Sequence, residues 1–328
     1  MNGPKKTWLA LMVATAIVWG VAASAQADSL AQSTLQLTGF EFLNAAGTAA
    51  IDASAFAPGT LNITDSTNLN PSLNGVFNPF STFTVGGAPI PLTVVCVPAG
   101  CPAGLNPGAP FANATTPPTV SGALGASSLD GEPITGIGGT LGANARTAAR
   151  AQLTSTGVAN SSANLGLVAQ FQFQPTASQA VRVDFNALMH LIAFLNTPGS
   201  ANAGVAWSIS ITDITGGGNT LVFSWAPDGL PGGIFGTGAL EISDPCNINT
   251  TRGLLSPGSA TADCNGHYTA LTPVLLSSEL YSVSIAHQNR ADVLLAPRVP
   301  EPATLSLLGL GLICVGFASR YRRSRKGV

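Results

Sequence analysis

Alternation of apolar and polar residues restricts the C-terminal half of this chain to a β structure. In segment 206–212, Trp207, Ile209 and Ile211 fall on one side of an extended strand, and small or polar residues fall on the other. The glycine-rich 216–219 then supplies a turn, and 221–225 alternates again. Two such segments joined by a short turn predict an antiparallel hairpin.

Further segments of this kind recur along the chain. They are 35–42, 61–64, 80–85, 92–97, 165–173, 180–185, 189–195 and 280–287. Short strands separated by turn residues, without helical periodicity, favour an antiparallel sandwich. The predicted fold class is therefore all-β, with an antiparallel, jelly-roll-like β-sandwich as the body over residues 28–298.

The middle of the body has a different composition. Residues 86–164 are rich in Gly, Ala, Pro, Ser and Thr, which predicts a low-complexity, loop-rich segment. Within it, Arg146 and Arg150 stand four residues apart in an alanine-rich stretch and would share one face of a short helix.

The N-terminus has the pattern of a secretory signal peptide. Lys5 and Lys6 precede the apolar stretch 8–21, and Ala25 and Ala27 form an A-x-A cleavage site. We expect residues 1–27 to direct the chain to the Sec-type export machinery, with a mature start at Asp28.

The C-terminus has three parts. Pro300, Glu301 and Pro302 precede an apolar run of sixteen residues, 303–318, and a basic end follows. The basic residues are Arg320, Arg322, Arg323, Arg325 and Lys326. With Ser319 and a snorkelling arginine, 303–319 is long enough to be predicted as a single transmembrane helix, and the cations favour a cytoplasmic end.

This order of Pro-Glu-Pro, apolar segment and basic end resembles the PEP-CTERM sorting tail, here residues 299–328. The resemblance implies an exosortase as partner, transient anchoring in the inner membrane, and release to the cell surface or outside. It also implies a link to exopolysaccharide and biofilm. An ordinary single-span anchor is the alternative reading. The body is similar to the exosortase-dependent surface protein group in 225–229 (Trp-Ala-Pro-Asp-Gly), Asp244-Pro245, and Tyr281 with Ile285.

Charge argues against one class of partner. Residues 28–300 hold 6 basic and 14 acidic residues, a net charge of −8. A nucleic-acid-binding protein needs a basic face, so we expect no nucleic-acid partner.

The cysteines fit an exported protein. Cys96 and Cys101 are close in sequence, Cys246 and Cys264 bracket a 17-residue loop, and Cys314 lies in the tail. Four cysteines allow three pairings, and local pairing is the simplest in an oxidising compartment. A four-cysteine metal site is the alternative, but the paired C-x-x-C spacing is missing.

The candidate chemical groups form no catalytic motif. His190 is expected to be a hydrogen-bonded core or sheet residue, His287 a surface group at a strand end, and His267 stands near no metal-binding spacing. Asp228 and Asp244 could act as a carboxylate pair for glycoside hydrolysis. With Asn247, Asn249 and Asp263 they could instead bind Ca²⁺, although Asp is common in such turns for backbone hydrogen bonding alone. We expect no catalytic residue, metal or cofactor.

Two classes of function remain. The first is a non-catalytic surface or matrix protein that is structural or associated with polysaccharide. The second is a secreted β-sandwich carbohydrate-binding module or glycan hydrolase. A glycan-binding face would need exposed aromatic residues; Trp207 and Trp225 are candidates, with burial in the core as the alternative.

Overall fold

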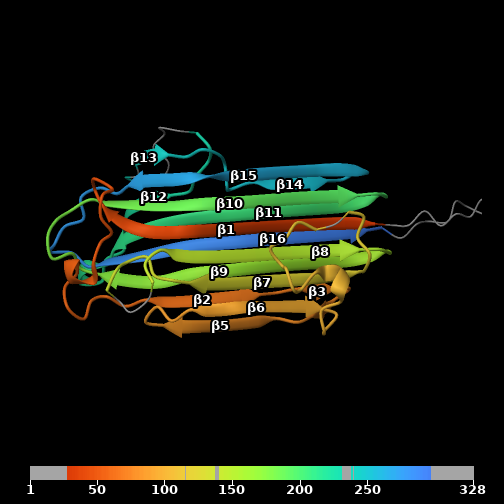
Figure 1. Ribbon diagram of the computed structural model, residues 1–328, viewed down its shortest axis with the longest axis horizontal. Coiled ribbons are helices and arrows are strands. Elements are labelled where there is room, and N and C mark those ends of the chain that lie inside the picture. Colours follow the sequence, from red (N-terminus) through yellow and green to blue (C-terminus); the bar gives the residue numbers. More distant parts are fainter. Residues whose placement is uncertain (1–27, 115, 137–139, 231–237, 239, 297–328) are drawn as a thin grey trace, which may run out of the picture. The chain divides into compact units, whose positions relative to one another are not determined.

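The computed structural model describes residues 28–114, 116–136, 140–230, 238 and 240–296, which form antiparallel sheets (Figure 1). Helical structure in these residues is limited to three single 3₁₀ turns: Ala53–Ala55, Ala103–Leu105 and Thr215–Gly217. The predicted all-β class with antiparallel pairing is confirmed. The strands belong to one compact unit that ends at Leu295.

Sheet 1 has seven strands in the order β13-β15-β10-β1-β8-β7-β6. Their bounds are β13 (Leu240–Ser243), β15 (Gly258–Leu271), β10 (Val181–Leu195), β1 (Ser29–Asn44), β8 (Ala143–Leu153), β7 (Gly122–Asp130) and β6 (Ile90–Val97). The first strand of the body is thus a central strand, paired on both sides by β10 and β8.

Sheet 2 has the path β12-β11-β16-β9-β2-β5, with three short strands beside it. Their bounds are β12 (Thr220–Trp225), β11 (Gly199–Asp213), β16 (Tyr281–Leu295), β9 (Gly157–Phe173), β2 (Thr64–Leu69), β5 (Phe80–Val85), β14 (Thr251–Leu254), β3 (Ser72–Leu73) and β4 (Val76–Phe77). The last strand of the body, β16, is also central, between β11 and β9.

The two sheets pack face to face, with the main core between them. Alternation along β16 shows why: its odd-numbered residues from Tyr281 to Leu295 are all buried, and the even-numbered ones are partly or fully exposed. Phe185 of sheet 1 lies 4.6 Å from Trp207 of sheet 2 and 5.7 Å from Trp225, measured between ring centroids. Aromatic rings from both sheets therefore close one part of the core.

Several predicted strands are confirmed, with changed bounds. Segments 206–212 and 221–225 form the expected hairpin of β11 and β12, in which Ile209 pairs with Trp225. Segments 180–185 and 189–195 are one continuous strand, β10. The strand expected at 61–64 begins only at Thr64.

The middle segment differs most from the sequence prediction. Of the 79 residues of 86–164, 36 belong to β6, β7, β8 and the start of β9, so the segment supplies strands to both sheets as well as long connections. The helix predicted around Arg146 and Arg150 is wrong, because both residues lie on strand β8. Alanines of β8 are buried against their neighbours in the sheets, and this tertiary burial overrides their helix propensity.

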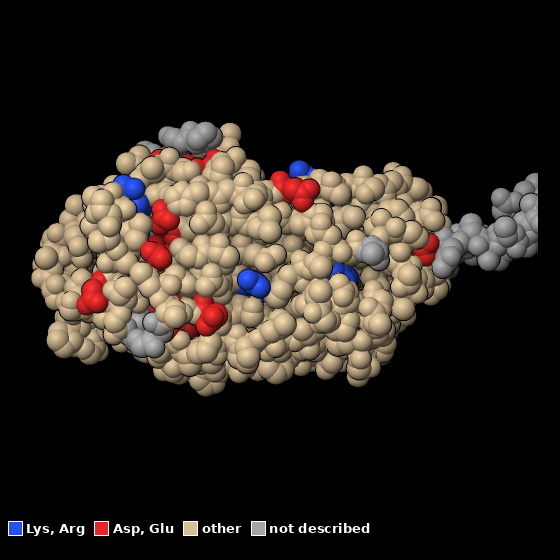
Figure 2. All heavy atoms as spheres, in the orientation of Figure 1, with Lys and Arg blue, Asp and Glu red and all other residues tan. Residues whose placement is uncertain are grey.

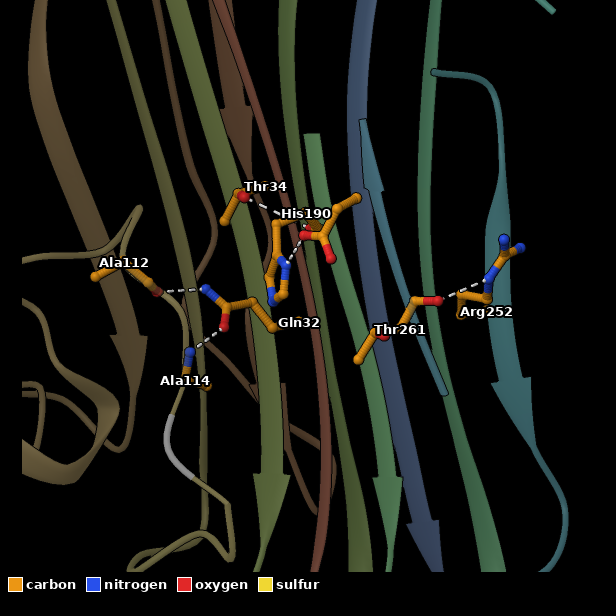
Figure 3. Close-up of polar contacts among 8 residues, drawn as sticks. Gln32, Thr34, Ala112, Ala114, His190, Arg252 and Thr261 are labelled. Atoms are coloured by element: carbon orange, nitrogen blue, oxygen red, sulfur yellow. Dashed lines mark hydrogen bonds and ion pairs between the residues drawn. The ribbon is translucent and has the colours of Figure 1, made fainter. Parts of the chain in front are cut away.

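The connection 98–121 covers part of the outer face of sheet 1. Beneath it, Leu105 packs with Cys96, Leu124, Ala126 and Ala148 as a second small core. Figure 3 shows one attachment: the Gln32 amide of β1 donates to the Ala112 carbonyl at 2.7 Å and accepts from the Ala114 N–H at 2.6 Å. Because connection 98–121 lies over this face of sheet 1, the first half of β1 and the second half of β8 are buried on both faces.

Candidate functional site

Three carboxylates lie close together at the edge of sheet 1 that β13 forms. Asp228 lies in the turn that follows β12, Glu241 is on β13, and Asp244 directly follows β13. One oxygen from each lies within 4.8 Å of the others. The exposed fraction is 4% for Glu241 and 1% for Asp244, while Asp228 is half-buried.

Each of the two buried carboxylates has one oxygen held by the protein. Asp244 Oδ2 accepts backbone N–H groups of Asp228 and Gly229 at 2.8 and 2.9 Å. Glu241 Oε1 accepts the Trp225 indole N–H at 2.7 Å. The other oxygens, Asp244 Oδ1 and Glu241 Oε2, are buried and have no hydrogen-bond partner among the described residues. Buried acceptors without a donor are costly, so one oxygen of each buried carboxylate stays unsatisfied.

The turn that carries Asp228 is fixed by its neighbours. Gly229 has a φ of +81°, and a Cβ there would lie 2.6 Å from the Asn247 backbone nitrogen, so only glycine fits. The Asn249 amide donates to the Pro227 carbonyl at 2.8 Å. Cys246 of the Cys246–Cys264 disulfide stands two residues after Asp244. The two predicted disulfides, this one and Cys96–Cys101, are both confirmed.

Only part of the predicted oxygen cluster comes together. Asp228 and Asp244 do meet, but Asn249 is occupied, because its Oδ1 accepts the Trp207 backbone N–H at 2.6 Å. Asp263 contacts His190 instead: its Oδ1 lies 2.5 Å from His190 Nδ1. The sequence interpretation missed Glu241 altogether.

The strand that carries Glu241 has an unusual burial pattern. In β13 the acidic residue is buried, whereas Leu240 and Ile242 are 50% and 46% exposed. This reverses the usual placement of apolar and charged residues. Burial is the main cause that raises the pKa of Glu241 and of Asp244, and the neighbouring carboxylates add to it. The reversal therefore has an electrostatic cost, which the hydrogen bonds from Trp225 and from the backbone N–H groups of Asp228 and Gly229 offset only in part.

A second acid pair lies inside the sandwich. Asp65 and Glu132 line an enclosed cavity of about 10 Å³, about the room of one water. Burial raises the pKa of Asp65 to about 6, and burial together with Asp65 raises that of Glu132 to about 7. The cavity is too small for a sugar ring.

The histidines are sheet residues. The surface position predicted for His287 is wrong: it lies within β16, is 1% exposed, and its Nε2 is 2.7 Å from Thr147 Oγ1 of β8. Burial lowers the pKa of His287 to about 3. His190, on β10, is a hydrogen-bonded sheet residue as predicted. His267 Nε2 lies 2.8 Å from Asp184 Oδ1.

The aromatic candidates for glycan binding are core residues. Trp207 and Trp225 are 1% and 0% exposed, so the alternative of core packing is confirmed. The most exposed aromatic residues of the described chain are instead Phe77 on β4 and Phe83 on β5, at 70% and 69%.

A polar groove runs over the outer face of sheet 2. It consists of two adjoining hollows of about 380 and about 230 Å³ that share Asn164 and Gln288. Its other polar lining residues include Asn68, Ser162, Asn202, Thr251 and Arg290. These come from β2, β9, β11, β14 and β16, which are far apart in sequence, so the sequence alone could not group them.

Comparison with known protein families gives a match in the C-terminal tail. Residues 298–323 match the PEP-CTERM protein-sorting motif. No curated protein and no solved structure matches the chain. The chain therefore carries a PEP-CTERM sorting domain, which marks a protein for exosortase-dependent sorting to the cell surface. The similarity of the body to the exosortase-dependent surface protein group stays a prediction.

The residues of this signal lie outside the described part of the chain. That holds for Pro300, Glu301 and Pro302, for the basic end, and for the signal-peptide residues Ala25 and Ala27. Among the described residues, no helical segment has the length and apolar character needed to cross a membrane.

Proposed function

We propose that this chain is an exosortase-sorted protein of the cell surface or extracellular matrix, non-catalytic and associated with exopolysaccharide. The match of residues 298–323 to the sorting motif carries this proposal. Export by the Sec-type machinery, removal of residues 1–27 and transient anchoring through 303–319 complete it. In support, β1 begins at Ser29, one residue after the proposed mature start.

The topology supports a jelly roll as the body. The central strands run β15-β10-β1-β8 in sheet 1 and β12-β11-β16-β9 in sheet 2. From β8 to β11 the chain changes sheet at each step, and it does so again from β15 to β16. In this interpretation β1 occupies the place that would follow β16, so the jelly roll is circularly permuted.

The polar groove supports a role in polysaccharide association. Asn, Gln, Ser and Thr side chains donate and accept hydrogen bonds without charge, and sugar hydroxyls need such partners. Among the residues that line the two hollows, Arg290 is the one Asp, Glu, Lys or Arg. Figure 2 shows another face of the molecule, on which acidic and basic groups are also isolated among neutral residues. A neutral polymer could therefore lie over sheet 2 and meet no charged side chain in the groove other than Arg290.

The hydrolase alternative has weaker support. A glycosidase needs two carboxyl groups beside the scissile bond, but Glu241 and Asp244 are nearly fully buried. Asp65 and Glu132 adjoin only the small enclosed cavity. A sugar could reach either pair only after a rearrangement of the body.

A polysaccharide panel tests this proposal. The exported protein, recovered from its own cells, should bind at least one neutral or acidic polysaccharide and release no sugar from it. The double variant Asn164→Ala and Gln288→Ala should lose binding, because both hollows lose amides. Asn265→Ala, an exposed amide on β15 of sheet 1, should bind as the wild type does. Release of oligosaccharides would favour the hydrolase, and no binding at all would leave a purely structural role.

A further inference from the structure

We propose that Asp228, Glu241 and Asp244 form a Ca²⁺ site. This inference does not depend on the polysaccharide proposal. It starts from the carboxylates as the protein holds them: two are nearly fully buried, and each of these presents an oxygen for which the protein supplies no donor. Among the described residues, the ion pairs involve His190, His267 and Arg290, and none includes a member of the cluster.

The spacing suits one cation. Oxygen atoms bound to the same Ca²⁺ lie roughly 2.3–2.6 Å from it, so two of them can be at most about 5 Å apart. One oxygen from each carboxylate meets this limit, at 4.8 Å or less. The remaining coordination positions of Ca²⁺ can be filled by water or backbone carbonyls.

The ligand chemistry selects a hard cation. The cluster offers carboxylates only, since the nearby Cys246 is in a disulfide and cannot supply a thiolate. Soft or borderline metals such as Zn²⁺ prefer nitrogen and sulfur ligands, while oxygen sites suit Ca²⁺ and Mg²⁺. Mg²⁺ requires shorter bonds of roughly 2.0–2.1 Å and keeps most of its water, which fits a site of three protein carboxylates less well.

The location gives the ion a structural purpose. Asp228 stands at one end of the connection between β12 and β13, and Glu241 and Asp244 stand at the other. A bound ion would tie both ends together and would offset the burial of Glu241 on its reversed strand. Ca²⁺ sites of extracellular modules have dissociation constants of roughly 10⁻⁴–10⁻³ M, so such a site would fill after export.

Terbium luminescence reads out the site directly. Tb³⁺ replaces Ca²⁺ at oxygen sites and emits when a nearby indole is excited. Trp225 donates to Glu241 at 2.7 Å, so an ion held by this carboxylate would lie close to an indole ring. The exported protein, stripped with a chelator, should show sensitised Tb³⁺ emission that added Ca²⁺ removes, and calorimetry should give one Ca²⁺ per chain.

Substitutions test whether Ca²⁺ binds at this cluster and not to acidic residues elsewhere on the protein. Glu241→Gln and Asp228→Asn should weaken Ca²⁺ binding on the order of 10- to 100-fold, at least as much as loss of an outer-shell partner does at other metal sites. Asp228 is half-buried, so its variant should fold even if Glu241→Gln does not. Asp263→Asn, which lies outside the cluster, should bind as the wild type does. The proposal is overturned if folded, disulfide-bonded wild type binds no Ca²⁺, or if Asp228→Asn binds as tightly as Asp263→Asn.

Discussion

Two disulfide-bonded regions bury polar side chains and satisfy them to different degrees. Under the connection 98–121, beside Cys96–Cys101, Arg150 donates from Nη1 to the Leu105 carbonyl at 2.6 Å and from Nη2 to the Ala112 carbonyl at 2.9 Å. Beside Cys246–Cys264, Glu241 and Asp244 each keep a buried oxygen without a donor. The two bonds from Arg150 fasten the first region, although Arg150 Nε is buried without a partner in the described part of the chain. Among the described residues, no cation pairs with the carboxylates of the second region.

The difference shows that buried polar groups can have two roles: some hold the fold together, and others can bind an ion. A buried cation that reaches backbone carbonyls fastens a loop to a sheet by its own hydrogen bonds. Burial lowers the pKa of Arg150 only to about 10, so it stays charged at neutral pH. Carboxylates that face one another repel and raise each other's pKa values, so their burial favours a proton or a bound cation. The residue types alone do not distinguish the two cases.

The largest expected effect is on the first region. Arg150→Met keeps an apolar stem but leaves two carbonyls without their donors, so unfolding should become easier by roughly 2–5 kcal/mol. Urea unfolding of the exported protein measures this. Arg146→Met is the matched control, because Arg146 is exposed on the same strand. Equal stability of the two variants would show that the guanidinium does not fasten the loop.

Removal of the disulfides should have the next largest effects. Cys246 and Cys264 are 18 residues apart and Cys96 and Cys101 are 5 apart. Restriction of the unfolded chain predicts losses of about 3 kcal/mol for the first pair and about 2 kcal/mol for the second when both cysteines become serine. Urea unfolding of the two double variants gives the order. A larger loss for Cys96 and Cys101 would contradict this order and would mean that the covered face depends on its disulfide more than loop closure alone predicts.

A smaller effect should come from substitution of Glu132. With Asp65 it forms another buried acid pair, but the cavity beside this pair has no room for an ion. The pKa of Glu132 is raised from 4.5 to about 7, so the folded state holds its proton more tightly than the unfolded state. The resulting stability is full below about pH 4.5 and is lost as the pH rises through about 7. Glu132→Gln should remove this part of the pH dependence, as measured by urea midpoints from pH 4.5 to 8.

Two other buried groups, Asp65 and His287, also change the stability of the fold with pH. Asp65 contributes in the same direction as Glu132, with a pKa of about 6. His287 contributes in the opposite direction: its pKa is lowered to about 3, so its stabilisation is lost as the pH falls from 6.5 through 3. The comparison of wild type with Glu132→Gln cancels the contribution of His287, and the substitution also removes the charge interaction between Glu132 and Asp65. Parallel pH profiles for the two proteins would contradict the buried-acid interpretation.

The sequence predicted the fold where alternation was strong. The hairpin at Trp207 and Trp225, the strand at 280–287 and the local disulfides followed from periodicity and spacing alone. It failed at Arg146 and Arg150, because alanine-rich strands carry little apolar alternation and their burial depends on a distant loop.

The candidate site was only half visible in the sequence. Asp228 and Asp244 stood out as turn residues, while Glu241 was hidden in a strand whose polarity is reversed. The groove around Asn164 and Gln288 depends on the order of strands in sheet 2. No local pattern encodes that order.

Sorting through the tail is tested most directly by Pro300-Glu301-Pro302→Ala-Ala-Ala in the full-length gene. The apolar run and the basic end remain, so the variant should insert into the membrane normally. Cell fractionation with intact-mass measurement should then find the uncleaved precursor in the inner membrane and little protein at the surface, whereas the wild type is trimmed and released. A variant that is still trimmed and reaches the surface normally would contradict exosortase-dependent sorting and leave the tail as an ordinary anchor.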